Sequence, residues 1–416
     1  MDRVILLVLD GVGAGALPDS AAYGDVGSDT LSHVLAQTGA RLTVLWSLGL
    51  GQVLGLPGRA LPSRPEGAYG RMAQRAVGKD STIGHWELMG CVAPRPFPTY
   101  PGGFPPDVLA HLQASTGRGV IGNRAASGTE IIKDLCAEHL RTGSWIVYTS
   151  ADSVLQIAAH ERVARVDELY GACEAMADYL MPARRILRVI ARPFVGEPGA
   201  LRRTPGRRDI NLPPPVPTAL DRLTDALVPV VTVGKVDGIF AGRGITEAIH
   251  TAGNSATMAA VRDELSLFGT GLLFANLIDF DMLYGHRNDV AGFGAALEAV
   301  DAFVGEIRQG LRPRELLLIS ADHGCDPTMP GTDHTREYVP VLACGPGVRQ
   351  AVDLGERRSF ADLGATVCEA LGIDPGPVGA GFWETIARPA IPEGEHIERQ
   401  RVDWFRRRSA LDGGFG

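Results

Sequence analysis

The stretch Leu-Leu-Leu-Ile-Ser-Ala-Asp-His-Gly, residues 316–324, places a carboxylate and an imidazole directly after an unbroken apolar run. Such a run is typical of a central parallel strand that is covered on both faces. Functional groups of α/β sheets gather at the carboxyl ends of these strands, so Asp322 and His323 are candidate metal ligands. His334 follows in a loop long enough to fold back over the strand end. The alternative is that Asp322 and His323 only cap a strand and that His334 lies on the surface.

Two further apolar runs end in the same way. Residues 4–9 are followed by Asp10 and glycine, and residues 271–278 lead into Asp281. His286 stands five residues past Asp281, across a glycine, so one loop can turn both side chains toward one ion. An aspartate before a glycine is common in turns, and Asp10 alone would be a weak signal. Three strands that each deliver a carboxylate to one sheet edge predict a shared site.

Together these segments supply three carboxylates and three imidazoles, enough for two metal ions. The predicted ligands are Asp10, Asp281, His286, Asp322, His323 and His334. A mixed oxygen and nitrogen set without thiolate favours manganese or magnesium at an oxygen-rich site and leaves zinc possible at a nitrogen-rich one. Paired metals about 4 Å apart can hold phosphoryl oxygens and activate a hydroxyl.

The alternation of strand-like runs with helical patterns, such as 294–307 and 360–371, predicts an α/β core with a doubly wound, mostly parallel sheet. Proline-rich segments at 95–101 and 211–217 bracket a stretch with its own strands and helix, which predicts a smaller inserted α+β cap domain. The chain of 416 residues also exceeds a comfortable single core. The expected domains are the core, residues 1–96 and 213–416, and the cap, residues 97–212.

Composition excludes several classes of protein. The net charge of −8 argues against a nucleic-acid partner or an anionic membrane, because an acidic surface would repel both. The six cysteines are far apart and form no Cys-x-x-Cys pair, a pattern that fits a reducing cytoplasm. No apolar run is long enough to span a membrane, and the first apolar run lacks the features of a signal peptide. We expect a cytoplasmic protein.

Two hydroxyls stand at the start of a helical pattern that runs to Met89. Ser81 or Thr82 can open this helix, beside free backbone N–H groups and the positive end of the helix dipole. That environment suits a nucleophile that carries a phosphoryl group. The structural alternative is a capping hydroxyl with no chemical role.

The segment 202–208 is rich in arginine, and Arg192 follows a strand-like run in the same part of the chain. On an acidic protein, clustered guanidinium groups favour phosphate recognition, because their fork of donors matches phosphate oxygens. The alternative is an ordinary solvated face, since not every arginine of such a run can point inward.

The motifs combine into a family pattern. They are VLDGVG (8–13), GDVGSDTL (24–31), DSTIGHWE (80–87), ADSVLQIA (151–158), DFDMLYGHR (279–287), ADHGCDP (321–327) and TDH (332–334). With these motifs the chain resembles the phosphopentomutases, metalloenzymes of the alkaline phosphatase superfamily. The resemblance covers nearly the whole chain and is weakest in the tail from Glu393 to Gly416, which we expect to lie on the surface. It implies an alkaline-phosphatase-like core with a cap.

The resemblance also implies roles for individual residues. It places the phosphorylated hydroxyl at Thr82 rather than Ser81. One metal would be held by Asp281, His286 and His334, and the other by Asp10, Asp322 and His323. Substrate-binding residues would be Asp152, Arg192 and Arg207 in the cap and Lys235 in the core. One departure is Gly11, where the family pattern has a serine.

The implied activity is the interconversion of ribose 1-phosphate and ribose 5-phosphate, and of the 2-deoxyribose equivalents, in nucleoside catabolism. Two divalent ions, Mn²⁺ above all, and a priming bisphosphate such as glucose 1,6-bisphosphate would be required. A phosphatase, sulfatase or phosphodiesterase with the same ligands is one rival function, and a non-catalytic sugar-phosphate or metal-binding protein is another. The native metal, the preference between ribose and deoxyribose and the oligomeric state stay open.

Overall fold

The computed structural model describes residues 1–389 except residues 57, 151 and 268, so the predicted surface tail from Glu393 onward lies outside the described residues. The chain forms two units. The first contains Met1–Arg95 and the chain from Pro214 onward, and the second contains Pro96–Pro213. Both crossings between the units fall in the proline-rich segments of the sequence.

The first unit is built on one sheet, which has eight strands among the described residues. Their order is β10 (Glu247–Ile249), β9 (Val230–Val233), β11 (Gly271–Leu277), β1 (Arg3–Leu9), β12 (Glu315–Ser320), β13 (Val339–Cys344), β2 (Ala68–Met72) and β14 (Val352–Arg357). The strands β10, β9, β11, β1 and β12 pair in parallel, and β13 runs against both of its neighbours. The predicted mostly parallel α/β sheet is therefore confirmed.

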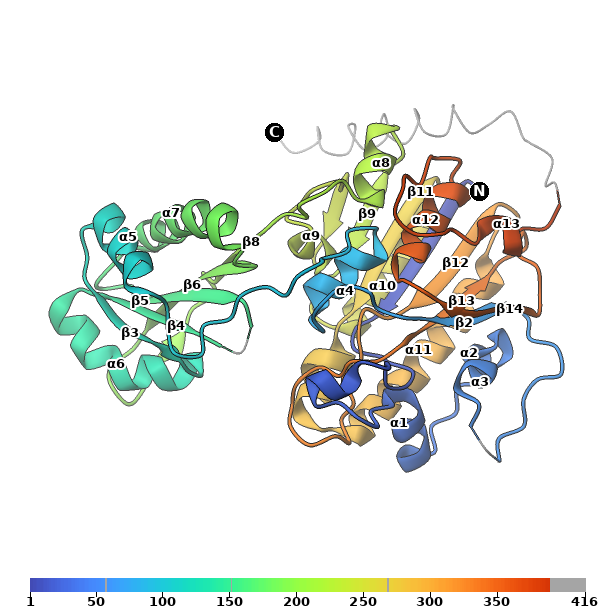
Figure 1. The fold of residues 1–416 in the computed structure, drawn as a ribbon, viewed down its shortest axis with the longest axis horizontal. Coiled ribbons are helices and arrows are strands. Elements are labelled where there is room, and N and C mark those ends of the chain that lie inside the picture. The colour runs from blue at the N-terminus through green and yellow to red at the C-terminus, as the bar shows by residue number, and fades with distance from the viewer. Residues whose placement is uncertain (57, 151, 268, 390–416) are drawn as a thin grey trace. The chain divides into compact units, whose positions relative to one another are not determined.

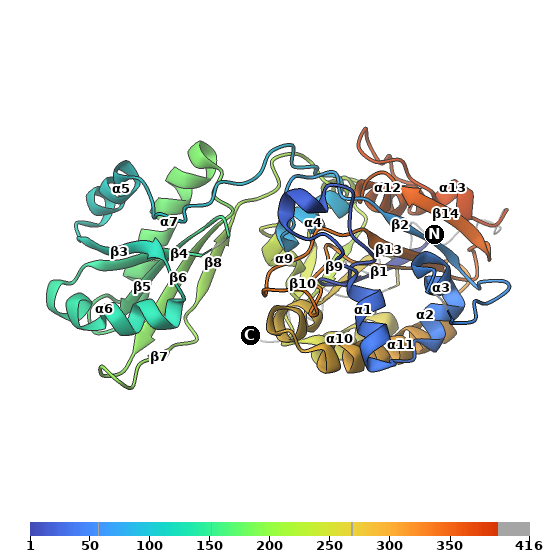
Figure 2. The ribbon, with the colours of Figure 1, turned by 60° about the horizontal axis from the view of Figure 1, so that its bottom comes forward.

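Helices cover both faces of this sheet (Figures 1 and 2). One face carries α1 (Thr30–Thr38), α2 (Thr43–Leu48), α10 (Asn254–Leu267) and α11 (Val290–Gly310). The other carries α4 (Ser81–Leu88), α9 (Val236–Ile239), α12 (Ala361–Ala370) and α13 (Trp383–Ile386). The helix α8 (Ala219–Asp225) packs against α12. The short α3 (Leu50–Leu54) packs against β2 and β13. Among the described residues, no helix is both long enough and apolar enough to cross a membrane.

The central strands explain why these sequence runs are continuously apolar. Every residue of β1, β11 and β12 is buried, because helices cover the strands on both faces. The parallel register aligns Leu9 with Leu277 and Val8 with Ser320. The three strands therefore end at one edge of the sheet, and the polar residues that follow them start from neighbouring positions.

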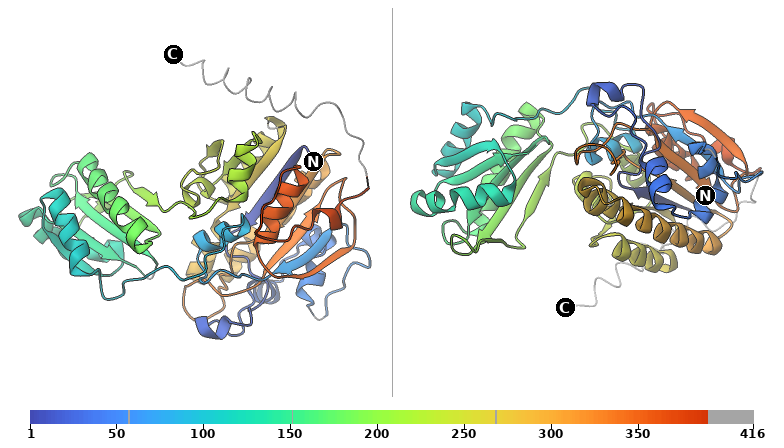
Figure 3. Two further views of the ribbon diagram at one scale, coloured as in Figure 1. Left: turned by 45° about the horizontal axis from the view of Figure 1, so that its top comes forward. Right: turned by 90° about the horizontal axis from the view of Figure 1, so that it is seen from below.

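The second unit is a smaller α+β domain, in which one sheet carries helices on both of its faces (Figure 3). Its sheet contains β3 (Val120–Ala125), β4 (Trp145–Thr149), β5 (Val154–His160), β6 (Arg188–Val195), β7 (Arg202–Arg203) and β8 (Arg208–Asn211). The helices α5 (Pro106–Thr116) and α7 (Val166–Arg184) pack on one face, and α6 (Gly128–Thr142) packs on the other. Separate apolar clusters fill the two layers, so this unit has a core of its own.

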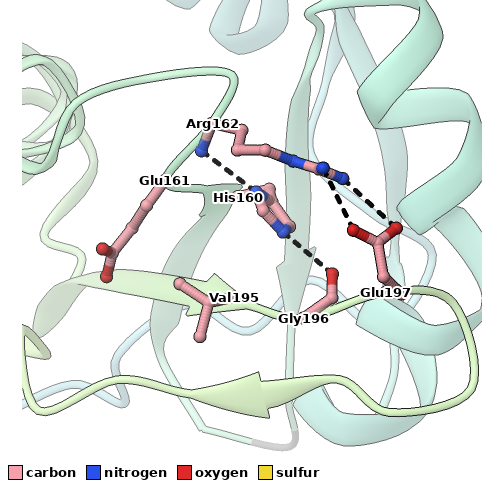
Figure 4. A pocket seen from close by; sticks show the side chains of 6 residues that line it. All are labelled: His160, Glu161, Arg162, Val195, Gly196 and Glu197. Carbon is pink, nitrogen blue, oxygen red and sulfur yellow. Dashed lines mark hydrogen bonds and ion pairs between the residues drawn. The ribbon is translucent and has the colours of Figure 1, made fainter.

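A buried histidine joins the ends of β5 and β6 (Figure 4). His160 Nε2 lies 3.0 Å from the carbonyl oxygen of Gly196, and Nδ1 accepts the backbone N–H of Arg162 at 3.0 Å. Arg162 in turn pairs with Glu197 at 3.0 Å. Both ring nitrogens of His160 are thus engaged within the unit, which makes this side chain a structural connection between two strands.

Candidate active site

One group of predicted ligands surrounds His323 at the end of β12. Its Nε2 lies 3.3 Å from Asp10 Oδ1 and 3.3 Å from Asp322 Oδ2. Its other nitrogen, Nδ1, lies 3.0 Å from the carbonyl oxygen of Gly324, which leaves Nε2 directed at the carboxylates. Ser81 Oγ approaches the same nitrogen at 3.0 Å. The ends of β1 and β12 and the start of α4 thus meet at one point.

A second group surrounds Asp281, which stands in a π-helical turn, Phe280–Tyr284, after β11. Its two carboxylate oxygens lie 3.1 Å from His334 Nε2 and 3.3 Å from His286 Nε2. His286 Nδ1 lies 2.6 Å from the carbonyl oxygen of Thr332, which orients the ring toward Asp281. Asp281, His286 and His334 offer ligand atoms that all lie within 4.8 Å of one another.

The two groups adjoin each other. Asp281 also offers an oxygen within 4.8 Å of ligand atoms of Asp10 and His323, so it belongs to both clusters. The rings of His323 and His334 lie 4.1 Å apart. All six residues that the sequence predicts as ligands therefore come together at the carboxyl edge of the sheet. Their assignment to two separate ions stays a prediction.

Three buried polar atoms of this cluster lie 2.9–3.3 Å from oppositely charged groups but form no hydrogen bond of good geometry, which fits a metal site. They are Asp281 Oδ1, Asp322 Oδ2 and His334 Nε2. An unpaired buried polar atom is costly, and a coordinated cation would satisfy all three. Oxygen and imidazole donors in this number suit divalent cations such as Mn²⁺ or Zn²⁺.

The carboxylates of the cluster raise the pKa values of its imidazoles. A hydrogen bond to Asp281 raises the pKa of His286 to about 9. Burial lowers the pKa of His323, but the neighbouring carboxylates of Asp322 and Asp10 raise it well above its usual value. Although burial opposes ionisation, neighbouring imidazoles hold the pKa of Asp281 well below its ordinary range. A bound metal would take the place of the ring protons, because metal ligands must be deprotonated.

The two candidate hydroxyls at the start of α4 differ in their contacts with the predicted ligands. Asp80 is the N-cap, since its side chain accepts the N–H of Ile83 at 3.1 Å, so neither hydroxyl is needed as the cap. Ser81 Oγ lies 3.3 Å from Asp10 Oδ1 as well as near His323. Among the described residues, the Thr82 hydroxyl makes no hydrogen bond to a predicted ligand. Of the two hydroxyls, Ser81 is therefore the one that contacts predicted ligands, and the role of Thr82 as the phosphorylated residue stays a prediction.

α4 can approach the end of β12 this closely because residue 84 is glycine. A Cβ on Gly84 would lie 2.0 Å from the carbonyl oxygen of Asp322, so any side chain would push the helix away from the strand end. The same helix carries His85, whose Nδ1 lies 2.9 Å from Asp322 Oδ2 and 2.9 Å from the carbonyl oxygen of Ser81. One turn of α4 thus connects the hydroxyl with a predicted ligand.

The sequence prediction missed three groups that support the ligands. His85 contacts Asp322, Asn276 donates from Nδ2 to Asp10 Oδ2 at 2.9 Å, and the N–H of Gly11 donates to Asp322 Oδ1 at 3.1 Å. Gly11 has a φ of +79°, and a Cβ there would lie 2.9 Å from the Cβ of Cys325, so glycine suits this position in the present chain. All three lie inside the recognised motifs or in β11, but their role depends on contacts across the chain.

The loop that carries His334 is held by two buried side chains that follow it. Arg336 donates to Asp19, to Gln74 Oε1 at 2.7 Å and to the carbonyl oxygens of Ala76 and Gly78. These contacts tie the ligand loop to the segment that leads into α4. Glu337, one residue on, accepts hydrogen bonds from α1 and from the segment after β1.

The predicted substrate-binding residues lie in both units. In the second unit, Arg192 Nε donates to Gln156 at 3.3 Å and is half-buried, whereas Arg207 forms two 2.6 Å contacts with Asp209. Asp152 is exposed in the turn between β4 and β5. In the first unit, Lys235 follows β9 and its Nζ lies 3.7 Å from the sulfur of Met282, next to Asp281.

Comparison with known proteins adds an independent observation. The model of the metalloenzyme superfamily matches residues 2–375. The phosphopentomutase of Caldanaerobacter subterraneus subsp. tengcongensis is 49% identical over 382 residues, 92% of this chain and 97% of that protein. The phosphopentomutase of Anaeromyxobacter dehalogenans strain 2CP-1 is 52% identical over 388 residues, 93% of this chain and 99% of that protein.

Similar solved structures are much more distant in sequence. A phosphoglycerate mutase of Leishmania mexicana gives a TM-score of 0.48 at 13% identity and covers 91% of this chain and 97% of that one. The PH0037 protein of Pyrococcus horikoshii gives a TM-score of 0.46 at 15% identity and covers 91% of this chain and 99% of that one.

Proposed function

The chain belongs to the phosphopentomutase family, which consists of metal-dependent phosphomutases within the metalloenzyme superfamily. From this family membership we propose the substrates of the chain and its covalent mechanism. The substrates are ribose 1-phosphate and ribose 5-phosphate, which the enzyme interconverts, and the 2-deoxyribose equivalents. The family resemblance predicted from the motifs is confirmed. The steps below are our proposal for this chain.

The six clustered residues hold two divalent ions, with Mn²⁺ as the proposed native metal. Asp281, His286 and His334 hold one ion, and Asp10, Asp322 and His323 hold the other. When bound, the ions supply positive charge to phosphoryl oxygens at the edge of the sheet. The ligand atoms that form no hydrogen bond of good geometry and the mixed oxygen and nitrogen donor set support this arrangement.

Ser81 carries the phosphoryl group. The single observation behind this proposal is the position of Ser81 Oγ, which lies 3.0 Å from His323 Nε2 and 3.3 Å from Asp10 Oδ1. Ser81 also stands in the first turn of α4, where free N–H groups and the helix dipole favour a phosphate. The resemblance implied this role for Thr82, and the contacts of Ser81 Oγ are the reason that we propose Ser81 in its place.

The reaction then follows from the chemistry of a phosphorylated hydroxyl. The bond between Ser81 Oγ and phosphorus breaks as the free hydroxyl of the sugar monophosphate takes the phosphoryl group, and the proton that this hydroxyl loses ends on Ser81 Oγ. The resulting sugar bisphosphate reorients in the active site, and its other phosphoryl group is transferred to Ser81. Hydrolysis of phosphorylated Ser81 leaves an inactive enzyme. Glucose 1,6-bisphosphate or a similar bisphosphate would then phosphorylate Ser81 again.

The second unit acts as the cap that recognises the sugar phosphate. Asp152, Arg192 and Arg207 bind the substrate from this unit, and Lys235 binds it from the first. Guanidinium groups match phosphate oxygens, and burial together with the nearby charge of Arg207 lowers the pKa of Arg192. The six cysteines are all free, which supports a cytoplasmic location.

The test is the intact mass of full-length, metal-loaded protein after incubation with glucose 1,6-bisphosphate. We expect one added phosphoryl group in the wild type and in Thr82→Val, and none in Ser81→Ala. Ser81→Thr is the matched control, because it restores a hydroxyl at the same backbone position and should be phosphorylated.

Three outcomes would contradict the proposal in different ways. Phosphorylation of Ser81→Ala but not of Thr82→Val would return the role to Thr82. An unmodified wild type would reject the covalent mechanism. A phosphorylated enzyme that releases inorganic phosphate but forms no ribose 5-phosphate from ribose 1-phosphate would be a phosphatase.

A further inference from the structure

Met282 is an exposed methionine beside the ligand cluster of the first unit. It stands in the π-helical turn Phe280–Tyr284, directly after the predicted ligand Asp281, and is 38% exposed. Phe280, at the start of the same turn, is fully buried and packs against Phe293. The turn is thus anchored by an aromatic ring and presents a thioether to solvent next to the proposed active site.

The other sulfur atoms of the protein are less accessible. All eight methionines and all six cysteines lie in the part of the chain that the structure describes. The cysteines are all buried, and every methionine other than Met282 is buried or only partly exposed. Oxidation of a thioether to a sulfoxide requires that the oxidant reach the sulfur. An oxidant that meets the folded protein should therefore react first at Met282.

The Met282 sulfur already has a cationic neighbour, Lys235. Lys235 follows β9, which pairs in parallel with β11, so the two residues leave the sheet at the same edge. Lys235 Nζ lies 3.7 Å from the sulfur and forms no ion pair with any described residue. A thioether sulfur is only a weak hydrogen-bond acceptor. A sulfoxide oxygen carries partial negative charge, so oxidation would turn this weak contact into a charge-assisted hydrogen bond.

We propose that Met282 is a site of reversible oxidation by hydrogen peroxide, and that the sulfoxide oxygen formed there binds Lys235. The sulfur gives two electrons to the peroxide, the O–O bond breaks as the S–O bond forms, and the second peroxide oxygen leaves as water with both protons. Two thiols, which are oxidised to a disulfide, would return the sulfoxide to the thioether and release its oxygen as water. The consequence for activity rests on the proposed function, in which Lys235 binds the substrate: the sulfoxide and the substrate then compete for one ammonium group.

The first experiment treats chelated, full-length protein with limiting hydrogen peroxide and follows the gain of one oxygen on each methionine peptide by mass spectrometry. Chelation removes metal ions that would generate radicals from peroxide. Met258, which is partly exposed on α10 of the same unit, is the internal reference. We expect Met282 to be oxidised several times faster than Met258. Equal rates at the two residues, or oxidation elsewhere while Met282 stays unmodified, would overturn the site.

The second experiment compares ribose 5-phosphate turnover before and after this treatment, once the peroxide has been removed and the enzyme has been loaded with manganese. Loss of a hydrogen bond from a charged group weakens binding roughly 10-fold or more, so the KM of the oxidised wild type should rise at least that far while its metal content stays the same. Met282→Leu lacks the sulfur, and its KM should not change on treatment. Lys235→Ala should have a raised KM that oxidation does not raise further, because the partner of the sulfoxide is already gone.

These variants separate the parts of the proposal. An equal rise of KM in treated Met282→Leu would show that another residue is responsible, and an equal rise in treated Lys235→Ala would overturn Lys235 as the partner. An unchanged KM in active, fully oxidised wild type would also overturn the coupling between the two residues. A protein that has no mutase activity, but in which Met282 is still oxidised first, would keep the oxidation site and reject the proposed function.

Discussion

His85 is a single residue on which both the proposed nucleophile and a predicted metal ligand depend. Its Nδ1 lies 2.9 Å from Asp322 Oδ2 and from the carbonyl oxygen of Ser81, whereas its Nε2 is buried and unpaired. The ring packs beside Phe274. The contacts therefore come from one nitrogen only, and the rest of the ring behaves as an apolar side chain.

We predict that His85→Leu weakens metal binding at the Asp322 site by about 10- to 100-fold, the usual effect of losing a group that orients a ligand. His85→Asn should keep the affinity near that of the wild type, because its amide nitrogen can take the place of Nδ1. Competition with a chromogenic chelator measures the affinity of each ion, and thermal unfolding checks the fold. Equal affinity in His85→Leu and the wild type would show that His85 does not orient Asp322.

At the scale of elements, Glu337 joins three segments around the site. Its carboxylate accepts the N–H and hydroxyl of Thr30 at 3.0 and 2.8 Å, the N–H of Gly15 at 3.2 Å and the hydroxyl of Thr335 at 2.6 Å. The start of α1, the segment after β1 and the loop of His334 are thus held by one side chain. Burial raises the pKa of Glu337 to about 7, although these donors oppose the shift.

This raised pKa predicts how the stability of the first unit depends on pH. The folded protein binds the Glu337 proton more tightly than the unfolded chain, so stability falls as pH rises from 4.5 to about 7 and is then constant. The full shift corresponds to about 3 kcal/mol. Glu337→Gln removes this titration, so its stability relative to the wild type should increase by up to about that amount between pH 5 and pH 8.

Urea denaturation of chelated protein at the two pH values measures the difference, and the exposed Glu384→Gln in the same unit is the control. A difference between Glu337→Gln and the wild type that stays the same at pH 5 and pH 8 would show that Glu337 is ionised in the folded protein over the whole range.

At the scale of the whole molecule, the activity requires a metal centre assembled from residues far apart in the chain. We predict that exhaustive chelation abolishes mutase activity and that Mn²⁺ restores it better than Ca²⁺, which prefers more oxygen ligands at longer distances. Asp322→Ala should keep its fold and lose one of two ions, as measured by metal analysis of purified protein.

The matched control is Asp279→Asn. Asp279 lies two residues before the predicted ligand Asp281, in the segment that follows β11. Its carboxylate accepts the N–H of Asn254 at 2.7 Å and does not belong to the ligand cluster. This variant should retain two ions. Full activity in metal-free enzyme, or two bound ions in Asp322→Ala, would contradict the ligand assignment.

The sequence by itself determined the family, the α/β class and the residues that gather at the sheet edge. Continuous apolar runs such as 316–320 are local signals, because a strand covered on both faces needs no polar positions. The ligand residues directly follow such runs or stand in short loops after them, so strand polarity alone brings Asp10 and Asp322 to the same edge.

Only the tertiary structure decided which hydroxyl faces the ligands and what holds the ligands in place. Adjacent helix residues point about 100° apart, so the choice between Ser81 and Thr82 depends on how α4 packs, and Gly84 sets that packing against Asp322. The reversed direction of β13 and the contact of Lys235 with Met282 likewise depend on the packing of distant segments. Sequence patterns record the burial and local conformation of a segment, whereas such contacts arise only when several segments pack together.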